Sequence, residues 1–111
     1  MLKKVLSTTA IAALAWIPTG AFAQTATYYA DYYQGRPTAS GETFNTWAYT
    51  AAHPSYAFGT WLRVTNRNNG RSVDVRVNDR CSCSLDLSKA AASDIGLLQA
   101  GRAPVSIQVL N

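Results

Sequence analysis

The stretch WLRVTNRNNGRSVDVRVND, residues 61–79, carries the clearest structural signal in the chain. Apolar and polar residues alternate along Trp61–Asn66 and again along Ser72–Asn78, which is typical of strands with one buried face. Between these two runs, Asn69-Gly70 is a strong turn dipeptide. The stretch therefore predicts a β-hairpin and makes a mainly β fold the expectation for the rest of the chain.

Two further strand-like segments precede the hairpin. Thr25–Ala30 and Trp47–Ala52 are rich in Thr and aromatic residues, which favour extended backbone. Gln34–Glu42 lies between them, and its Gly, Pro and Ser residues predict turns. The first half of the domain is thus predicted as two short strands joined by a turn-rich loop.

The chain after the hairpin predicts one helix and one more strand. Residues 89–95 have a helical pattern, with Ser88 in the N-cap position and Gly96 as the stop. Residues 103–110 alternate again and place three apolar side chains on one face: Val105, Ile107 and Val109. Five or six short strands with one small helix indicate a compact β-barrel.

The first 23 residues predict a secretory signal peptide. Lys3 and Lys4 precede an apolar run over residues 5–17, and Ala21-Phe22-Ala23 has the form of an export cleavage site. The run is too short for a good bilayer span. No cysteine follows it, so no lipid anchor is expected. We expect an exported protein of the periplasm or cell wall, with residues 24–111 as its single domain.

The net charge gives little information about function. Without Lys3 and Lys4, eight Lys and Arg residues face six Asp and Glu residues, so the net charge falls from +4 to +2. A charge of +2 does not indicate nucleic-acid binding. Seven of the eight cations are Arg, whose guanidinium suits hydrogen bonding to oxygen-rich partners. Export places Cys81 and Cys83 in an oxidising compartment.

Asp79 ends the second strand of the hairpin. Val73, Val75 and Val77 occupy one face of that strand, and Asp79 continues their series if the strand stays regular. Its carboxyl would then point inward at the barrel rim, where partial desolvation raises the pKa toward the range of a general acid. The adjacent Arg80 would lie on the opposite face. The alternative is a turn aspartate that accepts backbone N–H bonds, which lowers the pKa.

Five segments, in this order and spacing, resemble one known family. They are TASGETF (38–44), YTAAH (49–53), FGT (58–60), VTNRNNGRSVDVRVNDR (64–80) and LDLSKAAASDIG (85–96). Together they resemble the RlpA-like (rare-lipoprotein-A-type) double-psi β-barrel family, over roughly residues 26–110. The resemblance implies a six-stranded double-psi β-barrel with one short helix.

The same resemblance implies an activity. Characterised members of the family are lytic transglycosylases that cleave peptidoglycan glycan strands, preferring strands stripped of stem peptides. Their proposed active-site residues correspond to Glu42, His53 and Asp79. In this reaction the muramyl C6 hydroxyl attacks its own anomeric carbon and leaves a 1,6-anhydro end. One carboxyl can carry both proton transfers, whereas an inverting hydrolase needs a second carboxylate ~6.5–9.5 Å away.

Three residues are predicted to bind substrate. Tyr33 and Trp47 are candidates for stacking on sugar rings, although core packing is the common fate of aromatic residues in a small barrel. Arg80 is a candidate for hydrogen bonding to sugar oxygens. We expect no metal, no cofactor and a monomer. Two alternatives stay open: a non-catalytic polysaccharide-binding barrel of expansin or barwin type, and an inverting hydrolase that uses Asp79 and Glu42.

The segment after Asp79 departs from the family. Common members have a longer loop with an NDRGPF start, whereas here two cysteines, Cys81 and Cys83, precede LDLS. A local Cys81–Cys83 disulfide and two free thiols are equally consistent with the sequence, because extended i,i+2 positions lie near the limit for a bridge. Intermolecular pairing is a third possibility. Zinc is the least favoured, because structural zinc sites space their cysteines more widely.

Overall fold

A computed structural model describes residues 23–111, so the predicted signal peptide, Ala23 apart, lies outside the described residues. Eight elements follow one another along the chain: β1 (Ala23–Tyr28), the 3-10 helix η1 (Asp31–Tyr33), β2 (Thr50–Ala52), β3 (Trp61–Asn66), β4 (Ser72–Asp79), β5 (Leu85–Leu87), α2 (Lys89–Asp94) and β6 (Ala103–Val109). Within this range, no helix is long and apolar enough to cross a membrane.

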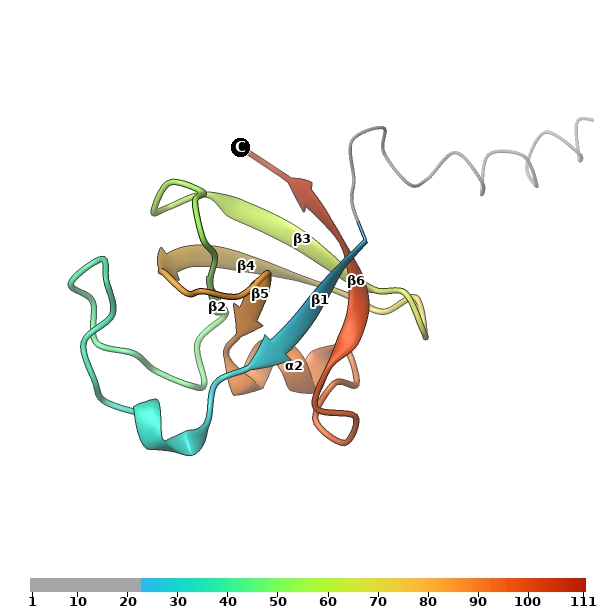
Figure 1. Cartoon of the computed structure of the whole chain (residues 1–111), viewed down its shortest axis with the longest axis horizontal. Helices are drawn as coiled ribbons and strands as arrows, with labels where there is room; N and C mark the ends of the chain where they lie inside the picture. The colour runs from blue at the N-terminus through green and yellow to red at the C-terminus, as the bar shows by residue number, and fades with distance from the viewer. Residues whose placement is uncertain (1–22) are drawn as a thin grey trace, which may run out of the picture.

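The six strands form one closed barrel in the order β1-β5-β2-β4-β3-β6 (Figure 1). β1 pairs with β5 and β2 pairs with β4 in parallel, and the other four pairings are antiparallel. β2 therefore lies between β4 and β5, two strands that follow one another in sequence. The predicted six-stranded barrel with one short helix is confirmed.

The predicted hairpin forms the β3–β4 pair. Leu62 pairs with Val75 and Val64 with Val73, and all four side chains are buried in the barrel core. On the outer face, the Arg63 guanidinium binds the Asp74 carboxylate at 2.9 Å. Gly70 has a φ of 76°, a backbone conformation that glycine adopts without strain in the turn. Alternation alone thus predicted this pair correctly.

The helix and the strand after it form near the predicted residues. Ser88 accepts the Ala91 N–H at 3.3 Å and caps α2, and Gly96 follows its end with a φ of 71°. In β6, Val105 and Ile107 are buried, but Val109 is 46% exposed. The predicted common face is therefore buried only in its first part, because Val109 lies at the open end of the strand.

Two predicted strand boundaries were wrong, and one strand was not predicted. The first strand is Ala23–Tyr28 rather than residues 25–30, because the chain turns into η1 after Tyr28. The segment 47–52 is extended only over Thr50–Ala52, since the Asn45 side chain accepts the Trp47 N–H at 3.0 Å and holds a turn there. The three-residue strand β5 was not predicted at all.

The two ends of β6 give a test of the core. We expect Val105→Ala to lower the free energy of unfolding by about 2 kcal/mol, because it removes buried methyl groups and leaves a cavity. Val109→Ala, the matched control at the exposed end, should change it by less than about 0.5 kcal/mol. Urea unfolding of residues 24–111 measures both. Equal losses for the two variants would contradict the described burial.

Candidate active site

A β-bulge at the end of β4 sets the direction of Asp79. Ala51 pairs with Val77, but Ala52 pairs with Asp79, so Asn78 is an extra residue on β4. Ala51 belongs to the barrel core, whereas Ala52 belongs to a second cluster with Tyr29 and Phe44. Because paired residues share a face, Asp79 lies with the second cluster and not with the valines. The expectation that Asp79 continues the inward series was wrong, since the strand does not stay regular.

Three donors hold the Asp79 carboxylate. The Tyr29 hydroxyl donates to Oδ2 at 2.6 Å, and the N–H groups of Ala39 and Arg80 donate to Oδ1 at 2.8 and 2.9 Å. Tyr29 is almost fully buried and stacks on Phe44 with ring centroids 4.1 Å apart. Burial and the bond to Asp79 raise the pKa of Tyr29 strongly, so this hydroxyl keeps its proton. Asp79 makes the backbone bonds of a turn aspartate and is also fixed by a side chain.

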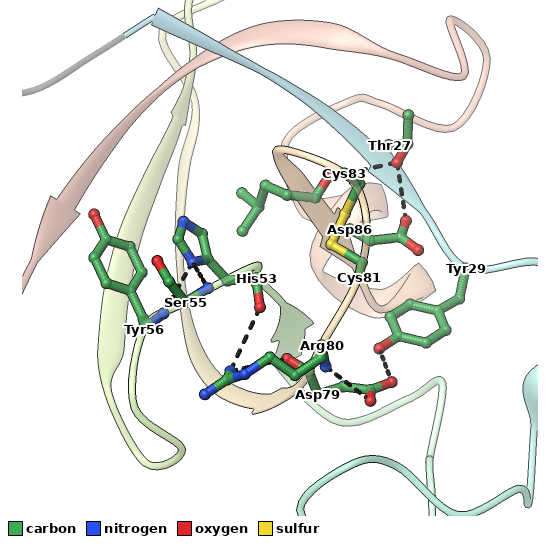
Figure 2. The surroundings of a disulfide bond; sticks show 11 residues. Thr27, Tyr29, His53, Ser55, Tyr56, Asp79, Arg80, Cys81, Cys83 and Asp86 are labelled. Atoms are coloured by element: carbon green, nitrogen blue, oxygen red, sulfur yellow. Dashed lines mark hydrogen bonds between the residues drawn. A yellow bond between two sulfur atoms is a disulfide. The ribbon is translucent and has the colours of Figure 1, made fainter.

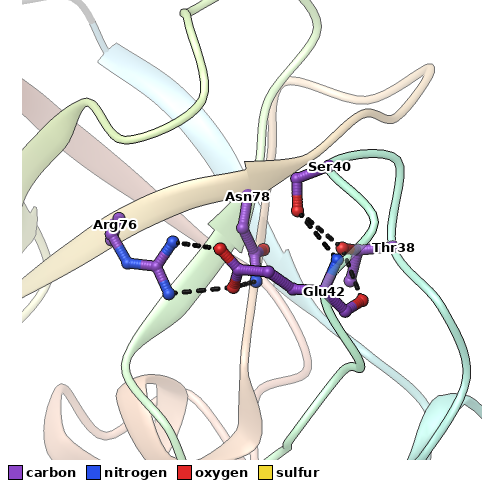
Figure 3. A network of polar contacts seen from close by, with 5 residues as sticks. All are labelled: Thr38, Ser40, Glu42, Arg76 and Asn78. Atoms are coloured by element: carbon purple, nitrogen blue, oxygen red, sulfur yellow. Dashed lines mark hydrogen bonds and ion pairs between the residues drawn. The ribbon is translucent and has the colours of Figure 1, made fainter.

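Glu42 is held as an anion beside Asn78 (Figure 3). The Arg76 guanidinium donates to its two oxygens at 2.7 and 2.9 Å, and the Asn78 amide donates at 3.2 Å. The bonds from Arg76 and then from Asn78 lower the pKa of Glu42 to about 2. The Thr38 hydroxyl binds the Glu42 carbonyl at 2.9 Å and closes the loop that carries it. Glu42 therefore has no proton to give near neutral pH.

His53 continues the chain after β2, and its N–H donates to the Asp79 carbonyl at 3.1 Å. The imidazole turns toward Tyr56 and not toward the Asp79 carboxylate (Figure 2). Its Nδ1 accepts the N–H groups of Ser55 and Tyr56, both at 3.1 Å, which leaves the proton of the neutral ring on Nε2. Burial and then the charge of Arg80 lower the pKa of His53. His53 is thus a neutral N–H donor near Asp79.

Asp86 is a second carboxyl on this face that sequence reasoning missed. It pairs with Thr27 on one side and with Ala52 on the other, and the Thr27 hydroxyl donates to it at 3.0 Å. Since Asp79 pairs with Ala52 from the opposite side, the two Cα atoms are roughly 10 Å apart, two strand spacings. Burial raises the pKa of Asp86, the hydrogen bond from Thr27 opposes this in part, and the negative charge of Asp79 raises the pKa further. The alternation of apolar and polar residues in Leu85–Leu87 was the sequence signal that could have identified this carboxyl.

The three predicted binding residues lie at different places. Tyr33 is 47% exposed and packs edge-on against Tyr29, which places it one ring away from Asp79. The Arg80 guanidinium lies over the Phe58 ring and 3.4 Å from the His53 carbonyl, on the other flank. Trp47 is 67% exposed, at the turn before β2. Both aromatic candidates are therefore at the surface rather than in the core.

The segment after Asp79 contains a disulfide bond between Cys81 and Cys83, drawn in Figure 2. Of the alternatives that the sequence left open, the structure has the local bridge. Within residues 23–111, no group of three or more His, Cys, Asp and Glu side chains is arranged to hold a metal ion. A surface hollow of about 440 Å³ lies elsewhere, between Tyr49, Arg63 and Asp94.

Fold and site together define a class of protein. A closed six-stranded barrel with two parallel pairs, β1–β5 and β2–β4, has the architecture of a double-psi β-barrel. Residues 21–107 match the family described as "Lytic transglycolase", and the chain belongs to this family.

Several curated relatives are named as endolytic peptidoglycan transglycosylases. The chain is 52% identical over 86 residues to the probable endolytic peptidoglycan transglycosylase RlpA of Treponema pallidum, covering 74% of this chain and 27% of the relative. It is 46% identical over 89 residues to endolytic peptidoglycan transglycosylase RlpA of Campylobacter jejuni, covering 77% and 32%. The chain thus spans about a third or less of these named relatives. An uncharacterised Synechocystis protein is 51% identical and is covered over 94% of its length.

Solved structures with this fold have other roles. A Streptomyces papain inhibitor superposes with a TM-score of 0.68 at 25% identity, covering 82% of this chain and 94% of the inhibitor. A Clavibacter michiganensis expansin mutant in complex with cellohexaose gives a TM-score of 0.63 at 26% identity, covering 82% of this chain and 50% of the expansin. The fold alone therefore does not specify catalysis.

The ion pair of Glu42 gives a prediction for pH titration. In Arg76→Gln, the pKa of Glu42 should rise from about 2 toward its ordinary value, because the charged form loses its main donor. The carboxyl ¹³C signal in an NMR pH titration measures the change. Arg63→Gln, which breaks the comparable pair with Asp74, is the control and should leave the Glu42 curve in place. An unchanged Glu42 pKa in Arg76→Gln would exclude the described ion pair.

Proposed function

We propose that this protein is an exported endolytic lytic transglycosylase of peptidoglycan, active as a monomer in the periplasm or cell wall. Membership of the family and the names of its relatives support the activity. The observation that carries it is a pair of carboxyls on one face of the barrel. Asp79 accepts a hydrogen bond from Tyr29, while burial raises the pKa of Asp86.

These two carboxyls divide the proton transfers of the reaction. Asp86 donates its proton to the oxygen that links N-acetylmuramic acid to N-acetylglucosamine, and the bond from the anomeric carbon to that oxygen breaks. The muramyl C6 hydroxyl attacks the same carbon and gives its proton to Asp79. The products are a 1,6-anhydro-muramyl end and a free N-acetylglucosamine hydroxyl, with no water consumed. The single-carboxyl mechanism expected from sequence becomes a shared one, in which Asp86 supplies a proton and Asp79, which accepts three hydrogen bonds, receives one.

Glu42 and His53 assist without transferring protons. Glu42 is a fixed anion at the rim, suited to orient sugar hydroxyls or to stabilise developing positive charge. The Nε2–H of His53 is a neutral donor to a sugar oxygen. Tyr33 on one flank and Arg80 with Phe58 on the other provide surfaces that a glycan strand can cross. Trp47, which is exposed at the turn before β2, is a further candidate for stacking on a sugar ring.

A non-catalytic polysaccharide-binding barrel is the second candidate. The similarity to half of an expansin that was solved in complex with cellohexaose favours it. The two functions differ in their products. Residues 24–111, which contain all six strands but for Ala23, are incubated with glycan strands stripped of peptides, and the products are analysed by mass spectrometry. Anhydro-muramyl ends support the transglycosylase; reducing ends alone indicate a hydrolase, and binding without products indicates the second candidate.

Asp79→Asn tests the proton acceptor. The substitution keeps the shape of the side chain but removes the base, so kcat should fall by roughly 10²–10⁴-fold, the usual range for general acid–base catalysis. The rate of release of anhydro ends measures this. Asp74→Asn, on the same strand but paired with Arg63 outside the site, should retain the wild-type rate. Wild-type turnover in Asp79→Asn would overturn the assignment of Asp79.

Asp86→Asn separates a functional from a structural acid. Because the folded-state pKa of Asp86 is raised, its charged form destabilises the fold progressively as pH rises above the ordinary pKa of an aspartate. The variant should therefore be at least as stable as wild type near pH 7 in urea unfolding, while kcat falls and the alkaline decline of the pH–rate profile that reports Asp86 disappears. A destabilised variant with an unchanged pH profile would assign Asp86 a structural role.

A further inference from the structure

The connection from β4 to β5 is longer than the gap that it bridges. Residues 80–84 join Asp79 to Leu85, and they pass the end of β2, which lies between the two strands. Two strand spacings are roughly 10 Å. Six extended residue steps reach roughly 20 Å. The segment is therefore longer than the distance that it spans, and without a restraint it can adopt many conformations between the two carboxyl-bearing strands.

The disulfide bond restricts these conformations. Cys81 and Cys83 have Cα atoms 5.1 Å apart. Two extended residue steps would separate them by roughly 6.6–7.2 Å, so the bond holds the segment in a bend. The Cys81 side chain also packs against the cluster of Tyr29, Phe44 and Ala52. Figure 2 shows the bridge beside Asp86 and above the Tyr29–Asp79 hydrogen bond.

We propose that the Cys81–Cys83 disulfide is a positioning clamp that holds the Asp79 and Asp86 carboxyls in their working arrangement. The disulfide-bonded segment connects directly to both carboxyl-bearing strands. At one end, Arg80 continues directly from Asp79, and its N–H binds the Asp79 carboxylate. At the other end, Ser84 leads into Leu85, the residue before Asp86. Cys81, between these ends, covers the tyrosine that orients Asp79.

The clamp acts on a short segment. Five residues separate Asp79 from Leu85, and two of them form the covalent bridge. A bridge restricts a short exposed segment that has few apolar side chains of its own. The consequence is a site whose turnover depends on the oxidation state of two cysteines. This inference rests on the proposed transglycosylase function for its effect on rate, but not for its effect on the carboxyl environment.

Reduction of the Cys81–Cys83 disulfide tests the clamp without a change in the sequence. The chain has two cysteines, so a reductant acts at this bridge alone. Dithiothreitol supplies two electrons and two protons, the S–S bond becomes two thiols, and the reagent closes to its own disulfide. We expect kcat to fall by about tenfold or more, since small displacements of catalytic groups have effects of this size. KM should change less than kcat, and reoxidation should restore the rate.

The double variant Cys81→Ala/Cys83→Ala is the matched control. It should have the low kcat of the reduced protein and no response to dithiothreitol, which excludes an effect of the reagent elsewhere. Circular dichroism and urea unfolding should show that the barrel is retained, because none of its six strands contains either cysteine. Equal kcat in the oxidised protein, the reduced protein and the variant would overturn the clamp.

A second readout needs no turnover. The ¹³C-detected titration of Asp86 should move toward the ordinary value of an aspartate on reduction, because a released segment admits water to a carboxyl now shielded by burial. If no state of the protein cleaves glycan, the proposed function fails while this titration still decides the clamp. An Asp86 curve that is the same with and without the bridge would overturn the inference in that case.

Discussion

The extra residue at Asn78 is the constraint on which the site depends. In a regular strand, Asp79 would follow Val77 onto the core face, and its charge would face the apolar interior. The bulge shifts the pairing with β2 by one residue, so that Asp79 lies opposite Ala52 and outside the core. One backbone irregularity thus exchanges a costly buried charge for a carboxylate at an accessible rim. It also brings Asn78 to Glu42, so the SGE-containing loop and the strand end meet.

The acidic residues around the bulge differ through their neighbours. Glu42 is exposed and bound by a guanidinium, which favours its anion. Asp86 is partly buried between two strands, and this burial raises its pKa although the Thr27 hydroxyl donates to the carboxyl. Asp79 is held by a tyrosine that keeps its own proton. Side chains of nearly equal chemistry therefore take different roles because the backbone places them at different depths.

The sequence was informative wherever the signal was local. Alternation located β3, β4 and β6, and the Ser88 cap located α2, since each of these depends on neighbours within a few residues. It failed where partners are distant. The three residues of β5 are a strand only because Thr27 and Ala52 lie on either side. The bulge depends on the register with β2, and no pattern inside β4 reports it. His53 was located by resemblance, but two backbone amides in the following turn set the direction of its ring.

The fold alone does not determine the chemistry of the site, which depends on its side chains. Barrels of this shape include a papain inhibitor and an expansin in complex with a cello-oligosaccharide, so the scaffold serves several roles. The proposed mechanism needs, beyond the scaffold, a proton source and a proton acceptor at a fixed separation. Here β2 is the spacer, because Ala52 separates Asp79 from Asp86 by one strand on each side. Strand β2 sets the distance between the backbones of β4 and β5, but it does not set the positions of their side chains. Those positions depend on Tyr29 and on the disulfide-bonded segment that passes the end of β2. Precision in this site is therefore a property of the connection between β4 and β5 as much as of the barrel.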